Sequence, residues 1–302
     1  MAYLLCVQRR PHDGAASSGG PVGPPVDDRV LPTPRVVSAG IVPVLTAAFV
    51  ILYLFPGRTD RLWAWTIPSQ MTAMLMGGGY LAGAVFFARA ARSRRWHRLG
   101  PGFLATTLFT TMLLAATLLH WDEFHHDHVS FWAWLALYVV TPPLLPLLWI
   151  RNRRHDPGTA EPGDRRVPPA LARVVAAVGA GQLAFAAVLF VRPSLFLSRW
   201  PWPVSPLSAR VVASFAVFPA VVYVAFAVER RWGALRWAFE TAIAGVALIG
   251  LAAVRARGEF RHGGVTTAWR VGLVVALAAL VGVWWAMHAP ATSGEPAAGE
   301  RG

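Results

Sequence analysis

The sequence predicts an all-α, polytopic integral membrane protein with eight transmembrane helices. Of the 302 residues, 55% are hydrophobic and 14% are charged, whereas soluble domains carry roughly 25% charged residues. The mean hydropathy is +0.47. Apolar runs of about 20 residues, the length that spans the hydrocarbon core of a bilayer, recur along the chain. They cover residues 36–55, 70–88, 103–121, 131–150, 171–191, 208–228, 238–254 and 266–288.

Polar segments flank and separate these runs. Residues 1–35 are rich in Gly, Pro, Ser and Asp, and residues 289–302 are similarly polar. Such sequences bury too little apolar area to offset the entropy of ordering, so we expect two disordered cytoplasmic tails. Residues 152–170 are charged and proline-rich, which is typical of a linker. A four-helix membrane unit is therefore expected on each side of it, over residues 36–151 and 171–288.

Short patterns of the first unit return in the second. Three occur in the same order in both units, and two of them recur at an offset of 136 residues (232 − 96 and 260 − 124). They predict two tandem four-helix repeats. Because each repeat has an even number of spans, the two share one orientation about a pseudo-twofold axis along the membrane normal. The matches are Trp63-Ala64-Trp65 with Trp200-Pro201-Trp202, Arg94-Arg95-Trp96 with Arg230-Arg231-Trp232, and Glu123-Phe124-x-His126 with Glu259-Phe260-x-His262.

The basic residues predict the orientation. All 28 are arginine, and the formal net charge is +13. Most lie in the tails and in one alternate set of loops, and an excess of positive charge marks the cytoplasmic side. We therefore predict a plasma-membrane protein with both termini in the cytoplasm. Because the arginines are spread over short loops, nucleic acid is not a predicted partner; the lipid bilayer is, and the sequence does not define an oligomer or partner subunit.

The densest group of titratable residues lies in the loop between the third and fourth runs, on the predicted outer face. Its carboxylates and imidazoles are ligands suited to a divalent transition metal. Under the pseudo-twofold, the second unit would bring a further carboxylate and imidazole to the same axis. The alternative is a solvated loop, since the spacing does not match a motif such as H-E-x-x-H. The candidate ligands are Asp122, Glu123, His125, His126, His128, Glu259 and His262.

A second set of candidates lies within the apolar runs. Charge in a bilayer is costly and usually faces a protein interior, so Arg210, Arg270 and Glu240 are candidate pathway residues. All three lie near the ends of their runs, where snorkelling to the interface is the alternative explanation. Pro142 and Pro143 interrupt the fourth run. Broken helices often line transport sites, although kinks also occur in ordinary helical bundles.

Three functions are consistent with these patterns. The first is a small-solute or ion transporter with its pathway between the two repeats. The second is a non-transporting sensor or accessory protein that binds a metal or partner at the outer cluster. The third is a membrane-embedded enzyme that uses the same carboxylates and histidines, but the sequence contains no recognised catalytic motif.

Overall fold

The structure, a computed structural model, describes residues 27–288, and the remainder of the two expected tails lies outside them. Within this range the chain forms an all-α bundle in which eight helices are long and apolar enough to cross a membrane. The predicted class, a polytopic helical membrane protein, is confirmed. The long helices are α1 (Pro32–Phe49), α3 (Gln70–Arg92), α4 (Gly100–Leu119), α5 (Val129–Asn152), α6 (Pro169–Val191), α8 (Pro206–Ala225), α9 (Trp232–Arg255) and α10 (Gly264–His288).

Short helical turns connect the long helices. A π-helical turn, η2 (Val50–Leu54), prolongs α1. The other connecting turns are η3 (Pro56–Arg58), α2 (Thr59–Leu62), η4 (Trp121–Glu123), η5 (Arg153–His155), α7 (Ser194–Leu197) and η6 (Arg257–Glu259).

The helix starts follow from local sequence. Proline occupies the first turn of α1, α4, α6 and α8, where its missing N–H costs nothing. The side chains of Ser69 and Ser205 accept a backbone N–H at the starts of α3 and α8, which are N-caps of the usual type. Because Pro32 begins α1, this helix starts earlier than the expected residue 36.

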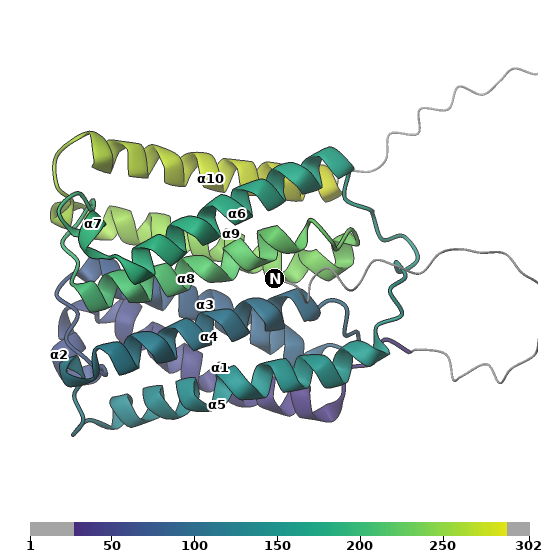
Figure 1. The fold of residues 1–302 in the computed structure, drawn as a ribbon, viewed down its shortest axis with the longest axis horizontal. Helices are drawn as coiled ribbons and strands as arrows, with labels where there is room; N and C mark the ends of the chain where they lie inside the picture. Colours follow the sequence, from purple (N-terminus) through teal and green to yellow (C-terminus); the bar gives the residue numbers. More distant parts are fainter. Residues whose placement is uncertain (1–26, 289–302) are drawn as a thin grey trace, which may run out of the picture.

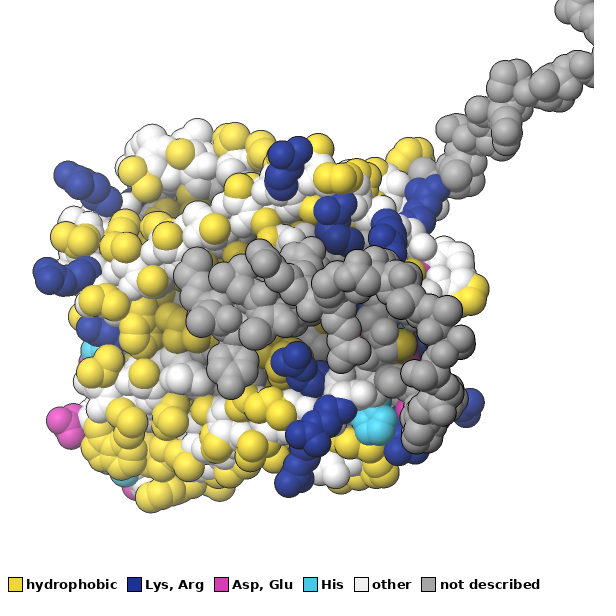
Figure 2. Space-filling model, turned by 45° about the vertical axis from the view of Figure 1, so that its right-hand side comes forward, with side chains coloured by type: hydrophobic (Ala, Val, Ile, Leu, Met, Phe, Trp, Pro, Cys, Tyr) yellow, Lys and Arg dark blue, Asp and Glu magenta, His cyan; other side chains and the backbone are white. Residues whose placement is uncertain are grey.

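The bundle has two distinct ends (Figure 1). We call one the linker end; it holds residues 27–31, the α3–α4 loop, the α5–α6 linker and the end of α10. Figure 2 turns this end toward the viewer and shows arginine side chains around it. We call the other the aromatic end, because two groups of aromatic rings packed edge to face lie there. They contain Trp63, Trp65 and Trp134, and Trp200, Trp202 and Trp269.

Helices of the two halves interlock. Within the halves, α1 packs on α3 and α6 packs on α8; between them, α3 packs on α9 and α4 packs on α8. Among the eight long helices, α3 is the most enclosed, with 72% of an 18-residue apolar stretch buried, and α10 is the least enclosed, with 11%. The apolar outer face of α10 is therefore the one expected against lipid. The tandem repeat itself stays a prediction.

Contrary to expectation, the prolines do not break helix α5. Helix α5 continues through Pro142 and Pro143, and Thr141 Oγ1 donates to the carbonyl of Leu137 within the same helix. The remaining hydrogen bonds of this 24-residue helix keep it continuous although each proline removes one. The irregular backbone lies instead in η2, where Tyr53 donates its hydroxyl to the Leu248 carbonyl and so ties the end of α1 to α9.

Candidate functional site

A cavity of about 250 Å³ lies between the two halves of the bundle. Residues of α1, α3, α4, α5, α6, α8 and α9 line it. The contributing residues come from the middle of these helices, for example Thr110 of α4 and Phe215 of α8, so the cavity lies near mid-membrane depth. Protein interiors otherwise pack at close to crystal density. A space of this size between membrane helices is therefore the principal candidate site for a small molecule.

The wall of the cavity is mainly apolar and aromatic. Among residues 27–288, no charged side chain lines it. Four threonines line the wall, and each donates its hydroxyl to a carbonyl of its own helix. The amide of Gln182 donates to the Ala216 carbonyl across α6 and α8. The polar lining residues are Tyr80, Tyr138, Thr106, Thr110, Thr141, Thr241 and Gln182.

Two tyrosines form the polar centre of this wall. Tyr80 of α3 and Tyr138 of α5 are 2% and 1% exposed, and their hydroxyl oxygens lie 2.9 Å apart. Phe215 packs edge-on against Tyr80, and Trp134 packs edge-on against Tyr138. Each hydroxyl carries one hydrogen, and their mutual bond uses only one of the two. No other described side chain or backbone group accepts the second hydrogen.

The histidines of the predicted outer cluster lie at the aromatic end and make local contacts. His125 donates its Nδ1–H to the Trp63 carbonyl, at 3.2 Å. His128 precedes α5, and its Nδ1 accepts the N–H of Ser130. His126 is exposed. Two of these three imidazoles therefore hold the loop in place.

Glu123 belongs to a chain of hydrogen bonds that joins α4 to α8. Arg210 donates to His120 Nε2 at 2.6 Å, and His120 Nδ1 donates to Glu123 Oε1 at 2.6 Å. Because Arg210 can only donate, the imidazole carries its hydrogen on Nδ1. The neighbouring Asp122 is exposed. Arg210, predicted to line a pathway, instead links the two halves at the aromatic end.

Glu259 caps the start of α3. Its carboxylate accepts hydrogen bonds from Ser69 Oγ at 2.6 Å and from the backbone N–H groups of Gln70 and Met71 at 2.9 and 3.1 Å. A carboxylate at this position compensates the unpaired N–H groups and the positive end of the helix dipole. His262, in the same loop, is exposed.

The structure does not bring the predicted metal ligands to one point. The two Glu-Phe-x-His segments bind different neighbours, as described above. Among the described residues, only Asp28, His97 and Glu161 form a group of three side chains close enough to share one metal ion. None of the predicted ligands belongs to such a group; they are Asp122, Glu123, His125, His126, His128, Glu259 and His262.

The remaining pathway candidates lie away from the cavity. Glu240 accepts from Arg236 at 2.8 Å and from Trp284 Nε1 at 3.1 Å, and it also pairs with Arg89, all near the linker end. Arg270 is exposed and lies over the Phe260 ring. Pro142 is half-buried and Pro143 is exposed, whereas the preceding Thr141 lines the cavity.

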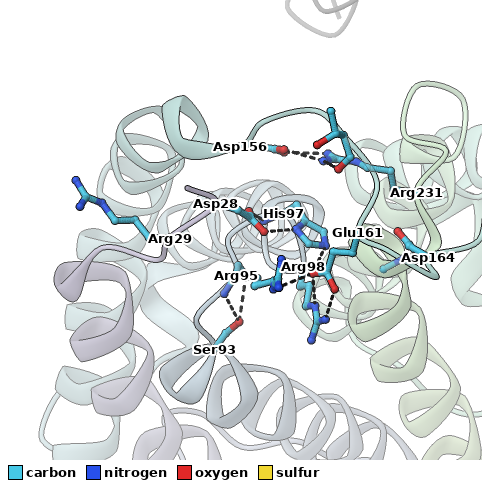
Figure 3. A network of polar contacts seen from close by, with 12 residues as sticks. Asp28, Arg29, Ser93, Arg95, His97, Arg98, Asp156, Glu161, Asp164 and Arg231 are labelled. Atoms are coloured by element: carbon cyan, nitrogen blue, oxygen red, sulfur yellow. Dashed lines mark hydrogen bonds and ion pairs between the residues drawn. The ribbon is translucent and has the colours of Figure 1, made fainter. Parts of the chain in front are cut away.

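A polar network that was not predicted from the sequence closes the linker end (Figure 3). Asp28, before α1, accepts the backbone N–H of His97 at 3.0 Å and its Nδ1–H at 2.5 Å. Glu161 of the linker lies 3.2 Å from His97 Nε2 and pairs with Arg95 and Arg98. Two arginines neutralise Glu161, whereas the buried Nε2 of His97 makes no hydrogen bond. The network fastens the linker and the N-terminal segment onto the α3–α4 loop.

A second ion pair of the linker lies beside it. Asp156 accepts two hydrogen bonds from Arg231, at 2.7 and 2.9 Å. Burial raises the pKa of Asp156, but the hydrogen bonds and charge of Arg231, with the Gly158 N–H and His97, outweigh it and hold the pKa below its usual value. Burial likewise lowers the pKa of Arg231, and its bonds to Asp156 and Glu229 raise it above the usual range. Both groups stay charged at neutral pH.

Comparisons with known protein families, with curated proteins and with solved structures find no match to this chain. The fold itself defines the class of this protein, which is a multi-pass helical membrane protein with a central cavity.

Proposed function

We propose that this protein is a transporter that moves a small molecule across the membrane through the cavity between its two halves. The observation that carries the proposal is the position of the cavity at mid-membrane depth, with walls from helices of both halves. Transporters built from two related halves place their substrate at such an interface, and rocking of one half against the other exposes it to each side in turn.

The helix pairing supports this proposal. The contacts α1–α3 and α6–α8 correspond in the two predicted repeats, as do α3–α9 and α4–α8. Two similar halves that share an interface of this kind are suited to rocking about it. The three sequence patterns that recur in the two units and these helix pairings support the same arrangement of two related halves.

Cysteine labelling tests the pathway without knowledge of the substrate. On a Cys6→Ser background, Thr110→Cys places a thiol in the cavity wall, and Ala105→Cys places one on the same helix, buried but outside it. A membrane-impermeant, charged thiol reagent, which can reach the thiol only while the cavity is open to water on that side, is added to either side of sealed vesicles. We expect labelling of the Thr110 variant from both sides and none of the Ala105 variant. Labelling of Thr110→Cys from one side only, or from neither, would contradict the proposal.

The second candidate is a sensor or accessory protein that binds a metal or partner at the aromatic end. The observation that favours it is the chain Arg210–His120–Glu123, through which binding at this loop would reach both halves. The test is the metal content of the purified protein beside its Glu123→Gln/His126→Ala double variant. A near-stoichiometric transition metal that the variant loses supports this function, and no metal in either sample assigns the cluster to loop structure.

A further inference from the structure

The chemistry of the cavity wall restricts what the cavity binds. A charged ligand would lose its hydration here and meet no opposite charge among the described lining residues, and an unpaired buried charge is strongly unfavourable. Apolar and aromatic side chains dominate the wall, so most of the ligand surface is expected to be apolar. A benzene-sized molecule fills a cavity of about 150 Å³, so this cavity of about 250 Å³ has room for one ring with a short substituent.

The tyrosine pair adds one directional requirement. Because Tyr80 and Tyr138 share a single hydrogen bond, one phenolic O–H is left to donate. A buried donor without an acceptor costs about 1–3 kcal/mol. The four lining threonines already donate to helix carbonyls, and Gln182 donates one amide hydrogen to the Ala216 carbonyl. The donors left for a ligand are therefore the phenol and the second N–H of Gln182. A ligand with one acceptor, such as a carbonyl oxygen, satisfies the phenol.

We infer that the cavity recognises an uncharged, mainly apolar molecule with one hydrogen-bond acceptor, which the Tyr80–Tyr138 pair binds by donating its free O–H. This inference rests on the proposed function, because it takes the cavity as the substrate site. Either tyrosine can supply the donor, since the pair can reverse the direction of its shared bond. Loss of one hydroxyl leaves the other free to donate, and only loss of both removes the recognition.

Acetophenone, with a ring and one carbonyl, is a suitable probe, and ethylbenzene is its counterpart without an acceptor. Acetophenone labelled with ¹³C at the carbonyl is titrated into the full-length protein in lipid nanodiscs, and the infrared carbonyl stretch is followed. We expect a saturable, lower-frequency band in the wild type and in each single variant, Tyr80→Phe and Tyr138→Phe. The double variant is expected to lose the band and about tenfold in affinity, equivalent to about 1.4 kcal/mol.

Ethylbenzene controls for the cavity itself. The rise that it causes in the melting temperature reports binding to the folded protein, and it is expected to be the same in the wild type and the double variant. Benzylammonium is expected to cause no rise. A hydrogen-bonded band that persists in the double variant, or no such band in the wild type, overturns the inference. Labelling of Thr110→Cys from both sides would in that case still support transport, whereas binding without two-sided labelling would leave a ligand-binding protein that does not transport.

Discussion

Glu259, in the loop that leads into α10, accepts a hydrogen bond of 2.6 Å from Ser69, which begins α3 in the other half of the chain. The same carboxylate accepts the first backbone N–H groups of α3. Helix α3 is the most enclosed helix of the bundle and supplies Tyr80 to the cavity. One side chain of the second half therefore fixes the start of the helix at the centre of the molecule.

Replacing Glu259 with alanine should destabilise the protein, because it leaves three hydrogen bonds at the start of α3 unmade. Hydrogen bonds to a charged group contribute roughly 1.5–3 kcal/mol, and the half-buried position favours the lower part of that range. Thermal unfolding of the purified protein in detergent measures the loss. His262→Ala, an exposed change in the same loop, is the control and should be neutral. Equal melting temperatures for the two variants would contradict this role of Glu259.

Loss of His97 should release the linker. His97→Ala leaves the buried carboxylate of Asp28 without the imidazole and removes a neighbour of Glu161. The linker carries exposed arginines, among them Arg154 and Arg166, which are cleavage sites for trypsin. We expect faster cleavage there than in the wild type, measured by mass spectrometry of the fragments. His155→Ala is the control, because His155 is more exposed and lies 3.4 Å from Asp27, and it should be cleaved at the wild-type rate. Cleavage of His97→Ala at the wild-type rate as well would contradict the role of His97 in holding the linker.

The ion pair between Asp156 and Arg231 should make stability depend on pH in the acid range. The pKa of Asp156 in the folded protein lies below its ordinary value of 3.8. The pair therefore stabilises the folded state fully above about pH 4, and this contribution is lost as the pH falls through the folded pKa. We expect the wild type to be more stable than Asp156→Asn at pH 7 and the difference to shrink toward pH 3. Melting temperatures of both proteins across this range check the sign; a difference that grows on acidification would refute it.

Close packing of α3 on the π-helical turn η2 requires glycine at position 77. A Cβ atom there would lie 2.9 Å from the backbone nitrogen of Tyr53, which cannot move aside as a side chain could. Gly77→Ala should therefore cost roughly 1–3 kcal/mol, the usual range for overpacking. Gly40→Ala, where nothing lies within 4 Å of the added atom, should be neutral or raise stability by up to about 1 kcal/mol. Thermal unfolding of the two variants decides, and a Gly77 variant as stable as the Gly40 variant would show that the helices separate at little cost.

The sequence was sufficient to predict the helices, because hydropathy over a span is a property of consecutive residues. All eight predicted runs lie within or close to the eight long helices. The prediction that prolines interrupt the fourth run was wrong for a local reason. Pro142 removes one hydrogen bond, but the rest of α5 and its packing keep the helix continuous. The π-helical turn at Tyr53 has no comparable sequence signal.

The contacts of the site were harder to predict, since they join residues far apart in the chain. Tyr80 and Tyr138 each occur singly in an apolar run, and nothing in either run shows that their hydroxyls meet. The cluster around Glu123 was conspicuous because its residues are consecutive, yet its side chains bind their own surroundings. One signal for the linker-end network was present: Asp28 and Asp164 are separated by 136 residues (164 − 28), the offset of two of the three repeated sequence patterns. Asp28 accepts the backbone N–H of His97, which follows Trp96. Asp164 accepts the backbone N–H of Gly233, which follows Trp232.

The interlocked halves have a consequence for biosynthesis. Helices α3 and α4 enter the membrane before α8 and α9 have been made, so their cavity-lining and interface surfaces first contact lipid or the insertion machinery. The start of α3 also lacks the Glu259 carboxylate until nearly the whole chain has been translated. A nascent chain that stops in the linker would hold four inserted helices without their partners. Final assembly of the membrane region is accordingly a late, post-insertional event in which the second half completes the first.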